Sequence, residues 1–512
     1  CRWFGGKART IKRVKISEVF PVTAGEFQGL LLFVDVHYMT GDPERYVMPL
    51  GHASAEKARE MIQERPSHVI AGLEGDGAGE QVVYDASDNP EFFRWLLKFV
   101  LHRGRRNGGA GELRGVPFKI GSAGKITQDI PDPVFMGVEQ SNSSAVFGDR
   151  FVLKLVRRLE DEINPEMEIG LFLTSRRFPH APPVKGAVEY RTGKGGIATV
   201  AVVHGFVPNL GDAWHHALDH LGRYYENILA ERPGAPAGLS VTFRDSGFPP
   251  EAETYMGDYI ESAGLLGRRT AELHRTLASD IVSGPFKPEP FSILYQRSLY
   301  QSLRTQTVQA LGVLKERAAS LPPTAAEDAE RVMAGKNRLL ELARRIVGGK
   351  IDSLRIRCHG DYHLGQVLYT GRDFVIIDFE GEPARPVSER RIKRSPLRDV
   401  AGMLRSFDYA AHAGILLCRD RGLVSDGDGS YLESWAECWQ RCAGAAFLHA
   451  YLAEAGDTKL LPGDINHLTD LLNFYLLDKA VYELGYELNN RPDWIRIPIR
   501  GVIRILEESG KE

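Results

Sequence analysis

The segment from Cys358 to Glu380, CHGDYHLGQVLYTGRDFVIIDFE, constrains the fold of this chain more than any other stretch. Two short apolar runs flank the turn-forming residues Thr-Gly-Arg-Asp, a pattern that predicts a β-hairpin. With the two runs paired across the turn, Gln366 falls opposite Ile377 and lies diagonally beside Asp378. The hairpin would then present an amide oxygen and a carboxylate side by side at its open end.

The polar residues of this segment have the spacing of a phosphoryl-transfer site. Asp361 follows His359-Gly360, Gln366 comes five residues later, and Asp378 opens an Asp-Phe pair after the hairpin. In kinase-type folds one carboxylate receives or orients the proton of the acceptor hydroxyl, while an amide oxygen and a second carboxylate hold Mg²⁺ on the nucleotide phosphates. The alternative, a solubilising surface hairpin, explains Asp378 alone but not the spaced set.

Lys154 is a lone cation within an apolar run, Phe151–Val156. Burying an ammonium group without a partner is costly, so the sequence predicts an anion beside it, either a carboxylate or a phosphate. A helix follows, opened by Asn164-Pro165, and it offers Glu168 as the favoured partner with Glu166 as the second choice. The alternative is a helix whose first turn is acidic only because of the helix dipole.

Two further segments are candidates for nucleotide contacts. A polar turn between two predicted strands would cover the phosphates with N–H groups and hydroxyls in place of glycines. A hinge after the apolar strand 197–203 would offer backbone groups to an adenine edge. These residues are Ser141, Asn142 and Ser143 in the turn and Gly205, Phe206 and Val207 in the hinge.

Composition narrows the class of protein. A chain of 512 residues with 43% hydrophobic and 26% charged residues is typical of a globular protein with two to four core-forming units. The net charge of −3 supplies no basic footprint for nucleic acid, and no apolar run is long enough to span a bilayer. Five sparse cysteines favour a reducing cytoplasm over a disulfide framework. We therefore expect a cytoplasmic protein with no nucleic-acid or membrane partner.

The pattern along the chain predicts three parts. Residues 1–125 alternate short strands with turns and contain one helix at 90–101, residues 126–208 form a second sheet with a helix, and residues 209–512 are mostly helical. The Gly- and Arg-rich run 103–111 is expected to be a loop at a boundary.

Three residues are predicted to support the catalytic loop. His359 and His363 flank Asp361. Asp399, near the start of a helix, is either an exposed first-turn carboxylate favoured by the helix dipole or a side chain that points back to accept hydrogen bonds from the loop backbone. The second interpretation is favoured.

Blocks throughout the chain resemble the bacterial maltokinases, relatives of the aminoglycoside phosphotransferases that also occur fused behind a trehalose synthase module. The likeness covers nearly the whole chain, and its C-terminal blocks point to maltokinases rather than to kinase-like proteins in general. The blocks are HGDYHLGQ at 359–366, DFEGEP at 378–383, SPLRDVAGMLRSFDY at 395–409, the opening CRWFGGKAR, the central QSNSS, LGRRTAELH at 266–274 and YELNNRPDW at 486–494.

The resemblance implies an α+β, bilobal kinase-like fold: an N-lobe of cap plus antiparallel-sheet subdomain over a mainly helical C-lobe. It implies transfer of the ATP γ-phosphate to the anomeric hydroxyl of maltose, giving maltose 1-phosphate for α-glucan synthesis, with ATP and Mg²⁺ as cofactors. By this resemblance Asp361 is the catalytic base, Gln366 and Asp378 are the Mg²⁺ ligands, and Lys154 and Glu168 are the phosphate-binding pair. A trehalose synthase module, fused or separate, is the implied protein partner.

Other functions stay open at this point. The acceptor could be another sugar, an amino sugar or an aminoglycoside, or the chain could be a non-catalytic kinase-like module of a glucan enzyme. Glu380 stands where protein kinases have glycine, and it would recruit another cation or contact the sugar. Further candidates for acceptor contacts are Asp408, Tyr409, Tyr486, Glu487 and Asn490.

Overall fold

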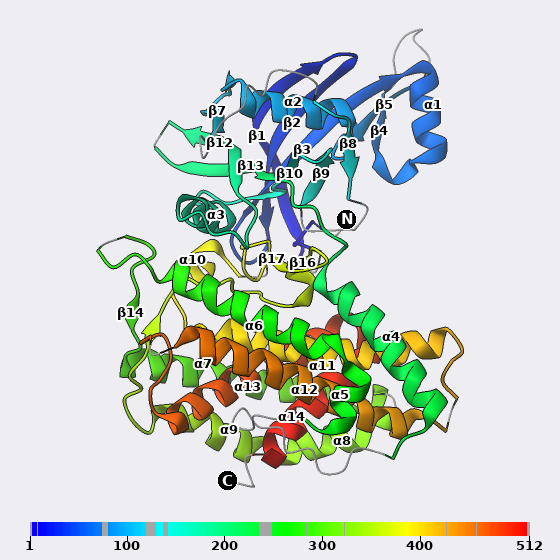
Figure 1. The fold of residues 1–512 in the computed structure, drawn as a ribbon. Coiled ribbons are helices and arrows are strands. Elements are labelled where there is room, and N and C mark those ends of the chain that lie inside the picture. Colours follow the sequence, from blue (N-terminus) through cyan, green and yellow to red (C-terminus); the bar gives the residue numbers. More distant parts are fainter. Residues whose placement is uncertain are drawn as a thin grey trace. The chain divides into compact units, whose positions relative to one another are not determined.

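The computed structural model describes all residues except 1–2, 8, 74–79, 119–129, 137–141, 194, 235–247, 283, 322, 384, 426, 457 and 509–512. The chain divides into two compact units, 1–208 with 382–391 and 209–381 with 392–512, and each is described here by itself. The first unit is rich in antiparallel strands and the second is mostly helical, as Figure 1 shows, which confirms the expected α+β class. The boundary expected at residue 125 lies outside the described residues.

The first sheet of unit 1 has the order β1-β2-β3-β5-β4, with β11 beside β3. Alternate residues of β2 enter two different cores, because successive side chains of a strand point to opposite faces. Leu31 and Phe33 join the main core, whereas Leu32 and Val34 pack on the other face against Phe4 and its neighbours. The strands are β1 (Ile11–Ala24), β2 (Phe27–Tyr38), β3 (Glu44–Ser54), β4 (Val69–Leu73), β5 (Gln81–Asp85) and β11 (Arg158–Leu159).

The second sheet has the order β6-β7-β12-β13-β10-β9-β8. Its edge strand β6 lies in the run 103–111, so the expected loop is wrong for residues 105–107, while 103–104 and 108–110 are irregular as expected. All three residues of β6 are exposed, and a solvated edge strand needs no apolar alternation that a sequence pattern would reveal. The strands are β6 (Arg105–Asn107), β7 (Gly111–Pro117), β8 (Pro133–Phe135), β9 (Ser143–Phe147), β10 (Phe151–Leu155), β12 (Val184–Thr192) and β13 (Ile197–Gly205).

Helix α2 (Pro90–Leu101) shares one core with both sheets. It begins as predicted, with the Asn89 side chain accepting a hydrogen bond from the Phe92 N–H at 3.0 Å. Helix α1 (Ala55–Glu64) was not predicted, because its apolar face is short, with only Ala58 buried and Met61 packed against the core.

Unit 2 consists mainly of helices, as the pattern over residues 209–512 predicts. The apolar pattern predicts continuous helices at 253–277 and 325–346, and both are divided, the first at Gly257, whose φ of +50° favours glycine, and the second at Gly335. None of the helices among the described residues is long and apolar enough to cross a membrane. The helices of unit 2 named below are α4 (Ala213–Glu231), α5 (Pro250–Met256), α6 (Asp258–Leu277), α7 (Ile293–Arg317), α8 (Pro323–Ala334), α9 (Lys336–Arg344), α11 (Leu397–Asp420), α12 (Gly429–Ala455), α13 (Ile465–Asn490) and α14 (Arg496–Glu508).

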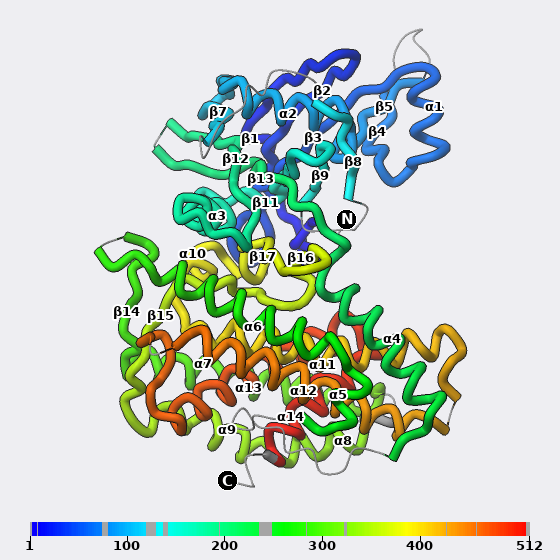
Figure 2. The backbone as a smooth tube through the Cα atoms, viewed as in Figure 1, coloured from blue at the N-terminus to red at the C-terminus, as the bar shows by residue number. Residues whose placement is uncertain are grey.

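The predicted hairpin forms from β16 (Val367–Tyr369) and β17 (Phe374–Ile376), and the backbone reverses direction tightly between them (Figure 2). The segment before α4 adds to its open edge, since the Leu210 N–H donates to the Tyr369 carbonyl at 2.8 Å and the Tyr369 N–H donates to the Gly211 carbonyl at 2.9 Å. Arg269 of α6 binds both carboxylate oxygens of Asp373 in the turn, each at 2.8 Å. The hairpin is therefore held from two sides.

Candidate active site

The open end of the hairpin has the predicted register. Val367 pairs with Ile376, and the Ile377 N–H donates to the Gln366 carbonyl at 3.0 Å, so Gln366 lies opposite Ile377. Asp378 follows with a φ of +64°, in the left-handed region that non-glycine residues seldom adopt. Such strain persists only where the surrounding structure enforces it, and it marks Asp378 as a functional candidate.

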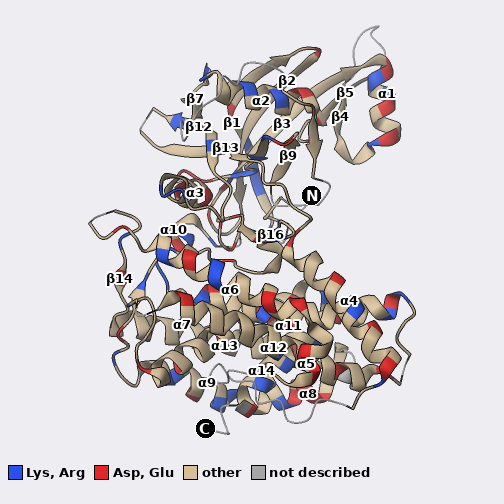
Figure 3. Ribbon diagram, viewed as in Figure 1, with Lys and Arg blue, Asp and Glu red and all other residues tan. Residues whose placement is uncertain are grey.

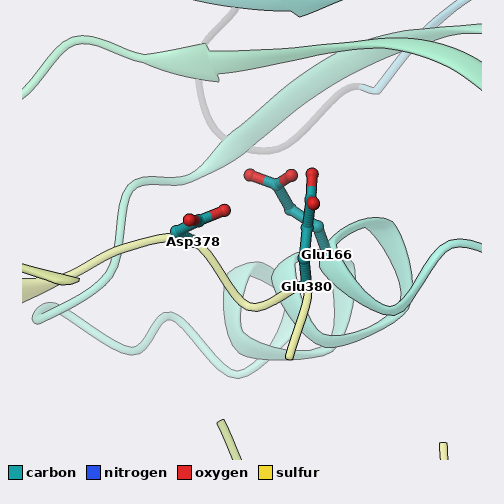
Figure 4. A group of neighbouring side chains, drawn as sticks. All are labelled: Glu166, Asp378 and Glu380. Carbon is teal, nitrogen blue, oxygen red and sulfur yellow. The ribbon is translucent and has the colours of Figure 1, made fainter. Parts of the chain in front are cut away.

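Asp378 and Glu380 lie on the same loop after β17, and Figure 4 shows both side chains. Each offers a carboxylate oxygen within 4.8 Å of the other, and Glu380 is 8% exposed. Two like charges this close destabilise each other unless a cation or a proton lies between them. Oxygen donors at this spacing fit a hard divalent cation such as Mg²⁺.

Asp361 is faced by positive charge. Lys479 of α13 places its Nζ 3.7 Å from the Asp361 Oδ1, and both side chains are about one quarter exposed, at 23% and 24%. Burial alone would raise the pKa of Asp361, but the charges of Lys479, His363, His359 and Arg398 outweigh it and hold the pKa below its ordinary value. Asp361 is therefore a carboxylate at neutral pH and is competent to accept a proton.

Asp399 braces the loop that carries Asp361. Its carboxylate accepts hydrogen bonds from the His359 N–H at 2.8 Å and the Gly360 N–H at 3.0 Å, as the favoured interpretation expected. His274 of α6 lies 3.1 Å from the same carboxylate, which is 1% exposed. Burial opposes ionisation, yet the hydrogen bond and charge of His274, the charge of His359 and the Gly360 N–H lower the pKa of Asp399 below its ordinary value.

The two histidines of the loop act on its backbone. The His359 ring lies 2.8 Å from the Ile377 carbonyl through Nε2 and contacts the Phe379 ring, so it ties the loop to the strand that leads to Asp378. His363 accepts a hydrogen bond from the Gly365 N–H at 3.1 Å through Nδ1 and so caps the turn that carries Gln366. Burial lowers the pKa of His363, which favours the neutral ring that this bond requires.

In unit 1 the strand lysine has the predicted carboxylate partner, but on a different residue. Lys154 Nζ lies 3.0 Å from Glu166 Oε2, whereas Glu168 forms an ion pair with Arg391 at 2.8 Å. Residues two positions apart on a helix point in nearly opposite directions, so only one of the two glutamates faces the sheet. Glu166, which Figure 4 shows on helix α3 (Pro165–Ser175), also contacts His204 at 3.1 Å. The choice of Glu168 as the partner of Lys154 is therefore corrected to Glu166.

One of the residues predicted to contact the nucleotide lies outside the part of the chain that the structure describes. That residue is Ser141, whereas Ser143 is the first residue of β9. Asn142 is 8% exposed, and its side-chain oxygen accepts a hydrogen bond from the Arg157 N–H at 3.2 Å. The buried amide of Asn142 thus ties the start of β9 to the segment that follows β10. The expected role in covering phosphates stays a prediction for this turn.

The hinge segment continues the sheet further than expected. The Gly205 N–H donates to the Pro183 carbonyl at 2.8 Å and the Phe206 N–H donates to the Arg150 carbonyl at 3.0 Å. These two donors are therefore used within unit 1, and only the carbonyl oxygens of these two residues suit an adenine edge. Val207 follows β13 and stays a candidate for such a contact.

Asp408 is not placed to contact a sugar, which corrects one acceptor candidate. Its carboxylate is 1% exposed and forms ion pairs with Arg405 and, at 3.3 Å, with Arg504. These charges, with that of His412, overcome the effect of burial and hold the pKa of Asp408 well below its ordinary value. Because the residue lies on the inner face of α11, its charge serves to join helices.

The other acceptor candidates lie around the C-terminal half of α13. Glu487 is 1% exposed and is bound by Tyr409 at 3.1 Å and by Arg491 at 2.7 Å, so its carboxylate orients neighbours. Asn490 is exposed, with its amide donating to the Tyr486 carbonyl at 2.9 Å. Tyr486 is 38% exposed, which leaves its ring accessible.

Two residues of the site were missed from the sequence, Lys479 and Tyr482. With Tyr486 they occupy positions i, i+3 and i+7 of α13 and therefore share one face. The Lys479 Nζ lies 5.1 Å from the centre of the Tyr482 ring, and the Tyr482 and Tyr486 rings stack with centres 6.5 Å apart. The helical spacing was readable in the sequence, but the face that α13 turns toward Asp361 was not.

Comparisons with known proteins show which kinases the chain is similar to. Residues 1–88 match the family model of the maltokinase N-terminal cap domain. The chain is 25% identical to a glucosamine kinase of Streptacidiphilus jiangxiensis over 73% of this chain and 74% of that protein. It is 24% identical to a glucosamine kinase of Mycolicibacterium smegmatis over 72% and 79%, respectively.

A solved glucosamine kinase structure (crystal form B) covers 99% of this chain and 96% of its own, with a TM-score of 0.62 and 19% identity. A glucosamine kinase in complex with glucosamine, ADP and inorganic phosphate covers the same shares, with a TM-score of 0.60 and 19% identity. These likenesses confirm a kinase-like fold over the whole chain.

Proposed function

We propose that the chain is a member of the kinase-like superfamily that includes the maltokinases and that it transfers the γ-phosphoryl group of ATP to the anomeric hydroxyl of maltose. The observation that carries the proposal is the braced loop of Asp361 beside the hairpin that ends in Asp378. An ionised, positioned carboxylate next to oxygen donors for a hard cation is what phosphoryl transfer requires.

In this proposal each unit supplies its own part of the chemistry. Asp361 accepts or orients the proton of the sugar hydroxyl, and its lowered pKa keeps it ionised for that purpose. Gln366 and Asp378, with Glu380 as a further donor, would hold Mg²⁺, which when bound neutralises phosphate charge. In unit 1, Lys154 would bind the nucleotide phosphates, with its ammonium oriented by Glu166 at 3.0 Å.

The face of α13 formed by Lys479, Tyr482 and Tyr486 favours a sugar longer than one ring. Its first and last residues are seven positions apart, a rise of about 10 Å along the helix. Aromatic rings present apolar faces with polar edges, which suits stacking of successive pyranose rings. Because Lys479 contacts Asp361, this face begins at the proposed base and leads away from it.

Amino sugars are the second candidate acceptors, because the relatives named above are glucosamine kinases. The third candidate function is that of a non-catalytic binding module. The side chains at positions 361, 366 and 378, which can accept a proton or bind a metal ion, argue against it. Nucleic acid is disfavoured as a partner, since both signs of charge are interspersed over the helices of unit 2 in Figure 3. A trehalose synthase partner and a cytoplasmic location stay predictions.

The test is an assay of the purified chain with Mg-ATP and a panel of maltose, glucose, glucosamine and kanamycin. We expect maltose to give the highest kcat/KM and Asp361→Asn to lower kcat by about 10²–10⁴-fold, the usual contribution of a general base. Asp352→Asn, an exposed carboxylate in the same unit, is the matched control and should leave kcat unchanged. ATP binding with no turnover of any sugar would reject the proposal.

A further inference from the structure

Lys479 carries a positive charge directly beside the proposed base. Its Nζ lies 3.7 Å from the Asp361 Oδ1, and roughly a quarter of each side chain is exposed. The ammonium group is thus neither sealed in the core nor fully solvated. An acceptor hydroxyl that reaches Asp361 must also approach Lys479.

Other charges around Asp361 do not cancel that of Lys479. Arg398 of α11 is a second cation that lowers the pKa of Asp361, whereas burial lowers the pKa of His363 and favours its neutral ring. One turn along α13, Glu483 is 8% exposed and is bound by Arg405 at 2.7 Å. The nearest carboxylate on the same helix face is therefore bound by another cation, and Lys479 and Arg398 are the two permanent cations that act on Asp361.

A positive surrounding discriminates between acceptors. An amino sugar carries an ammonium group at neutral pH, and at a partly desolvated site two like charges repel more strongly than in bulk water. A neutral sugar meets no such repulsion, and its hydroxyls can accept hydrogen bonds from an ammonium group. Specificity is often built from such unfavourable contacts with the wrong ligand.

We propose that Lys479 is a specificity-determining residue that selects a neutral sugar acceptor over an amino sugar. The inference rests on the proposed function, because it requires that the sugar hydroxyl approach Asp361. Lys479 would explain why this chain prefers an acceptor other than that of the glucosamine kinases, which it resembles in fold.

The experiment compares Lys479→Met, which keeps the length of the side chain but removes its charge, with Lys479→Arg, which keeps the charge. The acceptors are maltose, glucosamine and N-acetylglucosamine, whose acetylated nitrogen is neutral. Lys350→Met, an exposed lysine of unit 2, is the matched control. Unfolding midpoints establish that each variant is folded.

We expect Lys479→Met to raise the ratio of kcat/KM for glucosamine to that for maltose by about tenfold or more, since one like-charge contact is removed. Lys479→Arg and Lys350→Met should leave this ratio close to that of the wild type. The ratio for N-acetylglucosamine to maltose should not change in any variant. If Lys479→Met turns over too slowly, dissociation constants from calorimetry test the same preference at the binding step, where the affinity for glucosamine relative to maltose should rise.

An unchanged glucosamine ratio in Lys479→Met, or an equal rise for N-acetylglucosamine, would overturn this inference while leaving the kinase proposal intact. Absence of turnover of every sugar by the wild type would instead overturn the proposed function together with this inference. The two failures are thus distinguished by the wild-type assay.

Discussion

Asp399 offers the sharpest test of how the catalytic loop is held. Its carboxylate accepts hydrogen bonds from two consecutive backbone N–H groups, those of His359 and Gly360, and it lies against His274. Substitution Asp399→Asn keeps the shape of the side chain but turns one acceptor oxygen into a donor. One of the two N–H groups then faces an NH₂ group and loses its partner.

The size of the effect follows from these contacts. A hydrogen bond to a charged group contributes about 1.5–3 kcal/mol, and a buried donor left without a partner costs about 1–3 kcal/mol. Because Asp399 is 1% exposed, water cannot replace the lost acceptor. We expect Asp399→Asn to lower the free energy of unfolding of unit 2 by about 2–4 kcal/mol.

The dependence on pH has a definite sign. The pKa of Asp399 in the folded protein lies below its ordinary value of 3.8. Its contribution to stability is therefore fully present above about pH 4 and is lost as the pH falls toward the lower folded pKa. The asparagine variant lacks this titration, so its stability should fall less steeply than that of the wild type in acid, and the two should converge.

The assay is urea denaturation of both proteins, followed by tryptophan fluorescence, at several pH values between 3 and 7. Asp420→Asn, an exposed residue near the end of the same helix, is the matched control and should behave as the wild type. A stability difference for Asp399→Asn that is below about 1 kcal/mol, or one that does not shrink in acid, would refute the proposed brace.

Three further results are expected. Glu166→Gln should raise the KM for ATP about tenfold because it removes the charge that orients Lys154, whereas Glu168→Gln should change it little; steady-state kinetics at varied ATP decides this. Asp408→Asn should lower the free energy of unfolding by about 3–5 kcal/mol, because it leaves buried arginine charge uncompensated, yet leave the KM for maltose nearly unchanged; urea denaturation with kinetics tests both. Chelation of Mg²⁺ by EDTA should abolish sugar phosphorylation and excess Mg²⁺ should restore it, and persistent activity would contradict the donor set around Asp378.

Features set by neighbours along the chain were predictable. The hairpin register followed from two apolar runs and a four-residue turn, and it placed Gln366 opposite Ile377 as observed. The helix predicted at 90–101 begins where the pair Asn89-Pro90 places a cap, since capping depends on only a few adjacent residues. Even the backward hydrogen bonds of Asp399 were accessible, because a carboxylate in a first helical turn has few roles to choose from.

Other features depended on how helices are rotated and packed, which no local pattern contains. The sequence by itself determined that Lys154 needs an anion and that the next helix offers two glutamates, but only the orientation of α3 toward the sheet selects Glu166 over Glu168. Likewise only the packing of α13 brings Lys479 to Asp361. Local sequence determines hydrogen bonding along a segment, whereas the direction of a helix face is decided by the apolar area it buries against distant segments.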